Sequence, residues 1–212
     1  MSHIVLRCPR CGRTRPADMS TDVCRDCGAP LDVEYLADHK TDGKSNTYEA
    51  RTPVHNASFG VSLGEGDTPC VHLKALGENL GMRRLHGKLE FLNPTGSFKD
   101  RGTAVMISVA MDHGVTELVE DSSGNAGASV SAYAARAGVK AHVFVPTDAP
   151  QAKLRQIRIY GAEVHPIEGL RDAVTAAAMV YHRQQGLVYA SHMLSPYFAE
   201  GTKTFAYEVA QQ

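Results

Sequence analysis

The sequence has no excess of charge of either sign and no long apolar run. Its 22 lysines and arginines nearly balance 23 aspartates and glutamates, so the formal net charge of −1 creates no overall field to attract nucleic acid or an acidic membrane. No stretch reaches the ~18 consecutive apolar residues of a membrane helix, and residues 1–7 lack the apolar core of a secretory signal. With 43% apolar and 21% charged residues among 212, the chain is predicted to be a globular cytoplasmic protein of one or two domains.

Cysteines are also few, and four of the five form one pattern. Cys8 and Cys11 make a CxxCG knuckle, and Cys24 and Cys27 make a second one after twelve intervening residues. The glycine after each pair permits a tight turn that directs two sulfurs toward one ion. Four thiolates at this spacing are typical of a closed, tetrahedral structural zinc site. Two disulfides are the alternative, but a cytoplasmic location argues against them. Cys70 stands apart and is predicted to be a small buried side chain rather than a nucleophile.

The cysteine segment can also be considered as a nucleic-acid-binding module. Its first 30 residues carry five arginines against three aspartates, which is a small excess for a phosphate-binding surface. They contain no aromatic side chain on which a base could stack. The favoured interpretation is a metal-stapled cap on the main domain, with no nucleic acid as partner.

The most informative stretch is NPTGSFKDRG, residues 93–102. Proline and glycine break any regular element there, and the apolar run 103–110 that follows predicts a helix. Ser97 is a plausible N-cap, which places Lys99 in the first helical turn. The positive end of the helix dipole and the neighbouring Arg101 both disfavour an ammonium at that position. A lysine placed this way can be a neutral nucleophile toward a carbonyl, although a lone loop lysine is more often an ordinary surface residue.

Beyond residue 115, strands and helices alternate regularly. Strands are predicted at 117–121, 141–145, 162–167 and 187–190, and the intervening helices are predicted to end before Gly138, Gly161 and Gly186. This alternation predicts parallel βαβ units with right-handed crossovers and a four-stranded parallel sheet flanked by helices. Upstream, residues 88–92 are predicted to be a short strand. Residues 81–88 fail as a Walker phosphate loop, because five residues separate the two glycines and leucine follows the lysine.

The turn after the first strand of this sheet carries a second chemical pattern, Ser123-Gly124-Asn125. Small residues let the backbone approach a ligand, and the helix that follows supplies free N–H donors. Asn125 can offer its amide to a ring oxygen. On its own, such a strand–helix turn more commonly binds nothing.

The stretch NPTGSFKDRG resembles the cofactor-attachment site of the threonine synthase family, within the fold-type II pyridoxal-phosphate (PLP) enzymes. The resemblance implies that Lys99 carries PLP as a Schiff base and that Asn125 hydrogen-bonds the 3′-oxygen of the cofactor, in a loop that matches at Ser123, Gly124 and Asn125. Residues 62–69, SLGEGDTP, are similar to the motif that opens the large domain of the family. Residues 195–204, SPYFAEGTKT, are similar to the segment that returns the chain to that domain. Many relatives carry a similar cysteine ribbon.

This resemblance divides the chain into five parts and implies an α/β architecture whose large domain is incomplete. The parts are a zinc ribbon (1–36), a connecting segment (37–57), the opening part of the large PLP domain (58–110), a small α/β domain (111–195) and a return helix (196–212). The Gly-rich loop for the cofactor phosphate, and the residue facing the pyridine nitrogen, are expected beyond the last residue. We therefore expect the isolated chain to be partly unfolded or self-associated, to bind PLP weakly or not at all, and to hold Lys99 near an open cleft. A homodimer is possible for the full-length enzyme.

The function implied is conversion of O-phosphohomoserine and water to threonine and phosphate, with Lys99 moving protons at Cα and Cβ. Two residue departures bear on it. Phe198 stands where threonine synthases usually have an arginine, the natural partner of the substrate phosphate, which leaves Arg101 or Arg158 as other candidates. Ala126-Gly127 replaces the threonine and serine of the family loop. The alternatives are β-elimination or β-replacement on another amino acid, as in serine/threonine dehydratase-like or cysteate synthase-like enzymes, and a non-catalytic truncated binding module.

Overall fold

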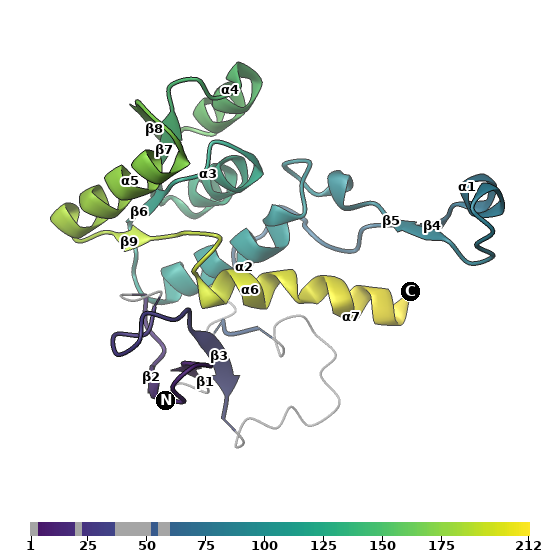
Figure 1. Cartoon of the computed structure of the whole chain (residues 1–212), viewed down its shortest axis with the longest axis horizontal. Coiled ribbons are helices and arrows are strands. Elements are labelled where there is room, and N and C mark those ends of the chain that lie inside the picture. The colour runs from purple at the N-terminus through teal and green to yellow at the C-terminus, as the bar shows by residue number, and fades with distance from the viewer. Residues whose placement is uncertain (1–3, 20–22, 37–51, 55–59) are drawn as a thin grey trace.

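The computed structural model describes residues 4–19, 23–36, 52–54 and 60–212. In Figure 1, the helix α2 (Lys99–Asp112) runs through the middle, a small N-terminal sheet lies on one side of it and a parallel sheet with its helices on the other. The predicted connecting segment 37–57 falls almost entirely outside the described residues. Among the described residues, no helix is long and apolar enough to cross a membrane.

The N-terminal part is a three-stranded antiparallel sheet in the order β2-β1-β3. Its strands are β1 (Ile4–Arg7), β2 (Thr14–Pro16) and β3 (Asp32–Tyr35). Side chains of this sheet share one apolar core with α2 and with α6 (Pro196–Thr202). Polar contacts reinforce this packing: the Tyr35 hydroxyl donates to Glu200, and the Tyr197 hydroxyl donates to the Asp18 carbonyl at 2.9 Å. The ribbon therefore packs against the main body of the chain, as a cap would.

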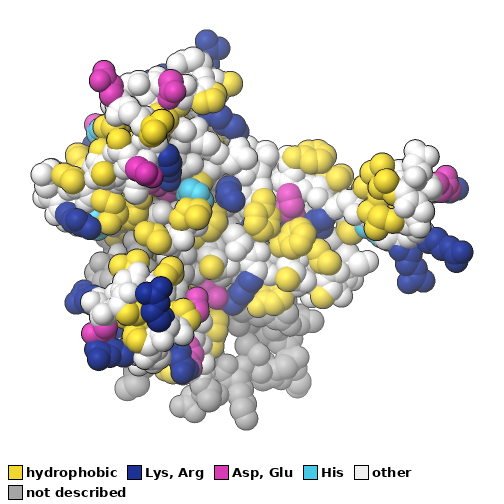
Figure 2. All heavy atoms as spheres, in the orientation of Figure 1, with side chains coloured by type: hydrophobic (Ala, Val, Ile, Leu, Met, Phe, Trp, Pro, Cys, Tyr) yellow, Lys and Arg dark blue, Asp and Glu magenta, His cyan; other side chains and the backbone are white. Residues whose placement is uncertain are grey.

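A hairpin-like arm precedes α2 and projects to one side (Figure 1). It pairs β4 (Cys70–His72) antiparallel with β5 (His86–Lys88), with the short helix α1 (Lys74–Asn79) between them. Leu76, Leu80 and Met82 near its tip are at least half exposed, and hydrophobic side chains are visible there in Figure 2. Cys70, predicted to be buried, is partly exposed on β4.

The predicted strand at 88–92 is wrong. Strand β5 ends at Lys88, and residues Glu90–Leu92 form a short 3₁₀ helix, η3. The apolar side chains that suggested a strand are exposed, Phe91 at 64% and Leu92 at 55%, so no core holds them in an extended conformation. The Asn93 side chain donates to the Glu90 carbonyl at 2.8 Å and thereby favours a tight turn over a sheet ladder.

The predicted four-stranded parallel sheet is confirmed, with the order β8-β7-β6-β9. Its strands are β6 (Glu117–Glu120), β7 (Lys140–Pro146), β8 (Glu163–Ile167) and β9 (Val188–Tyr189). The helices between them are α3 (Asn125–Ala137), α4 (Gln151–Ile159) and α5 (Arg171–Gln185). Gly138 and Gly186 end α3 and α5 in the left-handed conformation, as the sequence predicts.

The two faces of this sheet are covered by different helices. Leu118, Val143 and Val145 belong to the core shared with α2 and α3, whereas Val119 and Phe144 pack with Val174 and Ala178 of α5. Alternate residues of each strand thus face opposite layers. Figure 1 shows α5 on one side of the sheet and α3 with α4 on the other.

The chain ends in α6 and α7 (Thr204–Gln211), which run beside α2 (Figure 1). Glycine lets α2 and α6 approach closely, because a Cβ at Gly201 would overlap the Arg101 carbonyl oxygen. At Gly102 a Cβ would lie 2.7 Å from the ring of Phe198. This close crossing sets the start of α2, and with it Lys99, against the C-terminal helices.

Candidate active site

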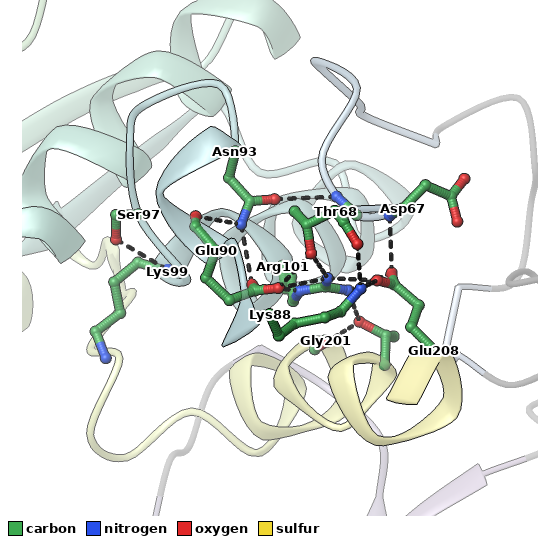
Figure 3. A network of polar contacts seen from close by, with 12 residues as sticks. Asp67, Thr68, Lys88, Glu90, Asn93, Ser97, Lys99, Arg101, Gly201 and Glu208 are labelled. Carbon is green, nitrogen blue, oxygen red and sulfur yellow. Dashed lines mark hydrogen bonds and ion pairs between the residues drawn. The ribbon is translucent and has the colours of Figure 1, made fainter. Parts of the chain in front are cut away.

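Lys99 is the first residue of α2, close to where the sequence places it. The Lys99 backbone N–H donates to Ser97 Oγ at 3.0 Å, so the Ser97 hydroxyl satisfies one of the donors at the start of the helix. The predicted N-cap, Ser97, is one residue too early: the N-cap is Phe98, whose backbone is already helical. Lys99 is partly exposed, and Figure 3 shows its side chain directed away from the buried polar groups beside it.

Asp100 joins the lysine stretch to α3. Its carboxylate accepts hydrogen bonds from the Thr95 backbone N–H at 2.7 Å, the Thr95 hydroxyl at 2.5 Å and the Ser129 hydroxyl at 2.6 Å. Burial raises the pKa of Asp100, and these three donors oppose that effect. Ser129 lies one helical turn after Asn125. The bridge therefore holds the helix that carries Lys99 against the first turns of the helix that carries Asn125.

The Ser123-Gly124-Asn125 loop follows the carboxyl end of β6, as predicted, and leads directly into α3. Asn125 is exposed at the first position of that helix, where backbone N–H groups lack helical partners. Gly127 explains one departure from the family pattern, because a Cβ there would overlap the Ser122 carbonyl oxygen. In this loop conformation the serine of the family pattern does not fit at position 127.

Residues 62–66 of the predicted entry motif are held by hydrogen bonds to the lysine stretch and to helix α3. Glu65 accepts hydrogen bonds from Ser62 and from the Leu63 backbone, and the Tyr133 hydroxyl of α3 donates to it at 2.7 Å. The Gly66 backbone N–H donates to Asn93 Oδ1 at 3.0 Å, at the beginning of the lysine stretch. The entry motif thus contacts the lysine stretch and also α3, the helix that follows the Ser123-Gly124-Asn125 loop.

Two carboxylates, Glu120 and Asp121, directly precede the Asn125 loop at the end of β6. Glu120 is fully buried, and His192 Nδ1 lies 3.0 Å from its Oε1. Burial raises the pKa of Glu120, while His192 lowers it. Asp121 accepts a hydrogen bond from the Thr175 hydroxyl at 2.6 Å and pairs with Arg171 at 2.9 Å.

Arg101 does not have the role suggested by its sequence position next to Lys99. It is 1% exposed, and its guanidinium makes paired contacts with two carboxylates, Glu90 at 2.7 and 2.9 Å and Glu208 at 2.5 and 2.7 Å. Lys88 Nζ also donates to Glu208, at 2.5 Å. The charge of Arg101 is therefore already balanced, and Figure 3 shows the network on the side away from the Lys99 amine. A guanidinium that is buried and paired with two carboxylates is not placed to read a substrate phosphate, so Arg101 is no longer a candidate for that role.

This network ties the hairpin arm and α7 to the start of α2. Burial would raise the pKa of Glu208, but hydrogen bonds from Arg101 and Lys88 lower it to about 2. The pKa of Glu90 is also lowered, because hydrogen bonds from Arg101 and Thr68 outweigh its burial. Both carboxylates therefore remain ionised at neutral pH.

Phe198 occupies a packed position on α6 and not an open one. It is 4% exposed, its ring lies against Gly102, and it meets the His192 ring edge-on with centroids 6.0 Å apart. At this position the chain therefore places an apolar ring beside the first turns of α2, where the family arginine would place a cation.

The four ribbon cysteines converge as predicted. Cys8 Sγ lies 3.4 Å from Cys27 Sγ, Cys11 Sγ lies 3.7 Å from Cys24 Sγ, and the four sulfurs all lie within 4.8 Å of one another. All are free thiols, so the structure has no disulfides here. The glycines after each pair have positive φ, +72° and +68°. A hydrogen bond from the Cys11 backbone lowers the pKa of the Cys8 thiol to about 6. In Cys27 a hydrogen bond from the Ala29 backbone lowers the pKa, but the neighbouring Cys8 thiol and burial raise it to about 11.

The polar groups that hold the site together carry little signal in the sequence. Asp100 does lie inside the NPTGSFKDRG stretch, and its position one residue after the lysine is the one local sign of its role. Ser129 and Glu208 carry no local signal, because their partners are 29 and 107 residues away.

Comparison with known proteins identifies the family. The family described as "Pyridoxal-phosphate dependent enzyme" matches residues 61–212. The threonine synthase of Methanocaldococcus jannaschii is 35% identical over 222 residues, covering 99% of this chain and 54% of the relative. That of Synechocystis sp. is 39% identical over 170 residues, covering 79% and 44%. The chain thus spans about half the length of the curated relatives it matches.

Solved structures give the same result. A pyridoxal 5′-phosphate-dependent aspartate racemase aligns with a TM-score of 0.65 at 33% identity, covering 68% of this chain and 46% of that one. Threonine deaminase isoform 2 from Solanum lycopersicum aligns with a TM-score of 0.62 at 25% identity, covering 68% and 40%. Together with the match over residues 61–212, these relatives show that the chain belongs to the pyridoxal-phosphate dependent enzymes, as a threonine synthase-like member of fold type II.

Proposed function

We propose that this chain provides the lysine and the ring-contacting loop of a PLP site, formed by Lys99 together with Ser123, Gly124 and Asn125. The observation that carries the proposal is the buried Asp100–Ser129 bridge, which fixes the start of α2 against the start of α3. A partly exposed amine and an exposed amide stand at these two helix starts. This donor set suits an aldehyde-bearing cofactor with a ring oxygen and a negative charge.

When bound, PLP supplies an electron sink for carbanions formed at the substrate. The chain's own residues have simpler tasks. The Lys99 amine is the attachment point for the cofactor and afterwards holds or returns protons at the substrate carbons. The Asn125 amide would donate to the ring oxygen of the bound cofactor, and the N–H groups at the start of α3 would favour negative charge nearby. Asp100 acts through position only, because its oxygens are taken by Thr95 and Ser129.

The reaction that we favour is conversion of O-phosphohomoserine and water to threonine and phosphate, in the cytoplasm. The curated relatives that cover most of this chain, from Methanocaldococcus jannaschii and Synechocystis sp., are threonine synthases. The partner in this proposal is a small amino-acid substrate. The proposal also includes the five-part division of the chain that the family resemblance implies.

A second candidate is β-elimination or β-replacement on an amino acid without a phosphate. The observation that favours it is Phe198, whose buried apolar ring replaces the cation expected to meet a phosphate. The resemblance to a threonine deaminase structure is consistent with such chemistry.

The cofactor assignment can be tested on the 212-residue chain itself. Because this chain is expected to bind PLP weakly, it is incubated with a large excess of PLP and reduced with borohydride, which traps even a weakly populated Schiff base, and the modified lysines are mapped by peptide mass spectrometry. We expect Lys99 to be the dominant labelled residue and Lys99→Ala to lose that label, while Lys74→Ala, which changes a lysine that is 78% exposed, retains it. A label spread over surface lysines with no preference for Lys99 would reject the assignment.

The substrate is tested separately, by supplying O-phosphohomoserine, O-acetylhomoserine, serine and threonine and measuring phosphate, threonine and 2-oxo acid products. Threonine formed from the phosphate ester alone supports the first candidate. Oxo acid formed from serine or threonine, with no use of the phosphate ester, would favour the second.

We also infer that Cys8, Cys11, Cys24 and Cys27 hold one structural zinc ion. Four ligands about 2.3 Å from a tetrahedral zinc lie about 3.8 Å apart, close to the sulfur separations of 3.4 and 3.7 Å. Elemental analysis of protein purified without chelator should give one zinc per chain, and a chain without metal would contradict the inference.

A further inference from the structure

A second cluster of metal-ligating side chains lies on the parallel sheet, away from the cofactor loop. His142 of β7 and Glu163 and His165 of β8 present ligand atoms that lie within 4.8 Å of one another. His142 and Glu163 are register partners, and His165 follows two residues further along the same strand, so all three face the α5 layer. They lie toward the amino ends of the strands, whereas the Asn125 loop follows a carboxyl end.

We propose that His142, Glu163 and His165 form a binding site for a divalent transition-metal ion of the Zn²⁺ type. His142 Nδ1 lies 3.1 Å from His165 Nε2, and each of these nitrogens lies 3.6 Å from an oxygen of Glu163. Ligands about 2.0–2.1 Å from a tetrahedral zinc lie about 3.4 Å apart, so one ion can contact all three groups with small side-chain adjustments. Two imidazoles and one carboxylate are a donor set that suits zinc better than calcium or magnesium.

The surroundings of His142 orient it as a ligand. The ring is 1% exposed, and its Nε2 lies 2.9 Å from Oε2 of Glu117 on β6. A proton on Nε2 shared with this carboxylate leaves the Nδ1 lone pair directed at His165 and Glu163. A carboxylate behind a ligating histidine is the usual arrangement in metal sites, where it fixes the tautomer and raises the basicity of the ligand.

Aromatic packing fixes the second histidine. The His165 ring stacks on Phe144 with centroids 4.5 Å apart and an interplanar angle of 11°, and Tyr181 of α5 lies against both histidine rings. The Tyr181 hydroxyl is 3.5 Å from His142 Nδ1. The rings are therefore held in place before any ion arrives.

Glu163 provides the entry side of the site. Its side chain is 49% exposed, and Lys140 Nζ lies 2.9 Å from its Oε2. Lys140 is itself 52% exposed, so it can turn to solvent when an ion takes the carboxylate. The three ligands thus run from a buried imidazole to an exposed carboxylate, as expected for a site that an ion enters from solvent.

Cobalt(II) separates this site from the cysteine ribbon. The 212-residue chain, saturated with one zinc in the ribbon, is titrated with Co²⁺ by calorimetry and absorbance. We expect a further equivalent of Co²⁺ whose ligand-field bands appear without the thiolate charge-transfer band of cysteine ligation. The double variant Glu163→Gln/His165→Gln changes partly exposed ligands and leaves buried His142 intact, and it should lose this equivalent while retaining the ribbon zinc.

Two further variants sharpen the test. Glu117→Gln should weaken Co²⁺ binding about 10–100-fold, because it removes the carboxylate that orients His142. The matched control His113→Gln/Glu168→Gln changes an exposed histidine and an exposed glutamate outside the cluster and should bind Co²⁺ like the unmodified chain. Absence of a further equivalent in the unmodified chain, or its retention in Glu163→Gln/His165→Gln, would overturn the proposal.

Discussion

Replacing Arg101 by methionine is expected to destabilise the protein strongly. The guanidinium makes four charge-assisted hydrogen bonds, two to Glu90 and two to Glu208, while only 1% exposed. Methionine leaves two carboxylates that are 16% and 15% exposed with most of their counter-charge removed. Breaking a buried ion pair in this way costs about 3–5 kcal/mol. Because Lys88 still contacts Glu208, we expect the lower end, about 3 kcal/mol.

The measurement is urea unfolding followed by circular dichroism, with one equivalent of zinc added to all samples. For a slope of about 2 kcal/mol/M, a loss of about 3 kcal/mol moves the midpoint by about 1.5 M. The control is Arg7→Met, which breaks the exposed pair with Glu34, whose side chains are 53% and 40% exposed. Such a surface pair contributes about 0–1 kcal/mol.

A loss for Arg101→Met no larger than that for Arg7→Met would refute the reasoning. The double variant Arg101→Met/Glu90→Gln separates charge from packing, because it removes the cation together with Glu90, the carboxylate that Lys88 does not contact, and keeps the Lys88–Glu208 pair. We expect it to be more stable than Arg101→Met alone. If it is not, the loss comes from packing of the side chain against the helices.

Four other predictions follow from the site and the ribbon. Cys8→Ser should release the ribbon zinc, seen as metal lost on dialysis, and zinc retained at full stoichiometry would contradict the four-thiolate site. The pKa of Glu208 is lowered from 4.5 to about 2, so its contribution to the free energy of unfolding is complete above about pH 4.5 and is lost as the pH falls toward 2. Glu208→Gln should therefore flatten the dependence of the unfolding free energy on pH over that window, and an unchanged slope would contradict this assignment. Phe198→Arg should raise the ratio of kcat/KM for O-phosphohomoserine to that for O-acetylhomoserine, because it supplies a cation for the phosphate. It should also lower thermal stability, because the Phe198 ring is only 4% exposed. An unchanged ratio would show that another group reads the phosphate. Gly127→Ser should destabilise by about 1–3 kcal/mol, because its Cβ meets the Ser122 carbonyl; a neutral result in thermal unfolding would show that the loop can shift.

Elements whose signals are local could be predicted from the sequence alone. The alternating pattern after residue 115 predicted four parallel strands, because apolar runs and glycine stops are read from neighbouring residues alone. The spacing of the cysteine knuckles likewise predicted that four sulfurs would converge. Lys99 at the start of a helix followed from the breakers before it and the apolar run after it.

Only the tertiary structure decided where the charges of the site go. Arg101 was predicted to act on its sequence neighbour Lys99, but its partners are Glu90 and Glu208, which sequence spacing could not indicate. The strand predicted at 88–92 was also wrong because of tertiary packing, since Phe91 and Leu92 are exposed and no layer covers them. Local propensity depends on a few adjacent residues. A buried charge instead pairs with whichever opposite charge the packing of distant helices brings within reach, because the free-energy cost of leaving it unpaired exceeds the stabilisation that any local preference provides.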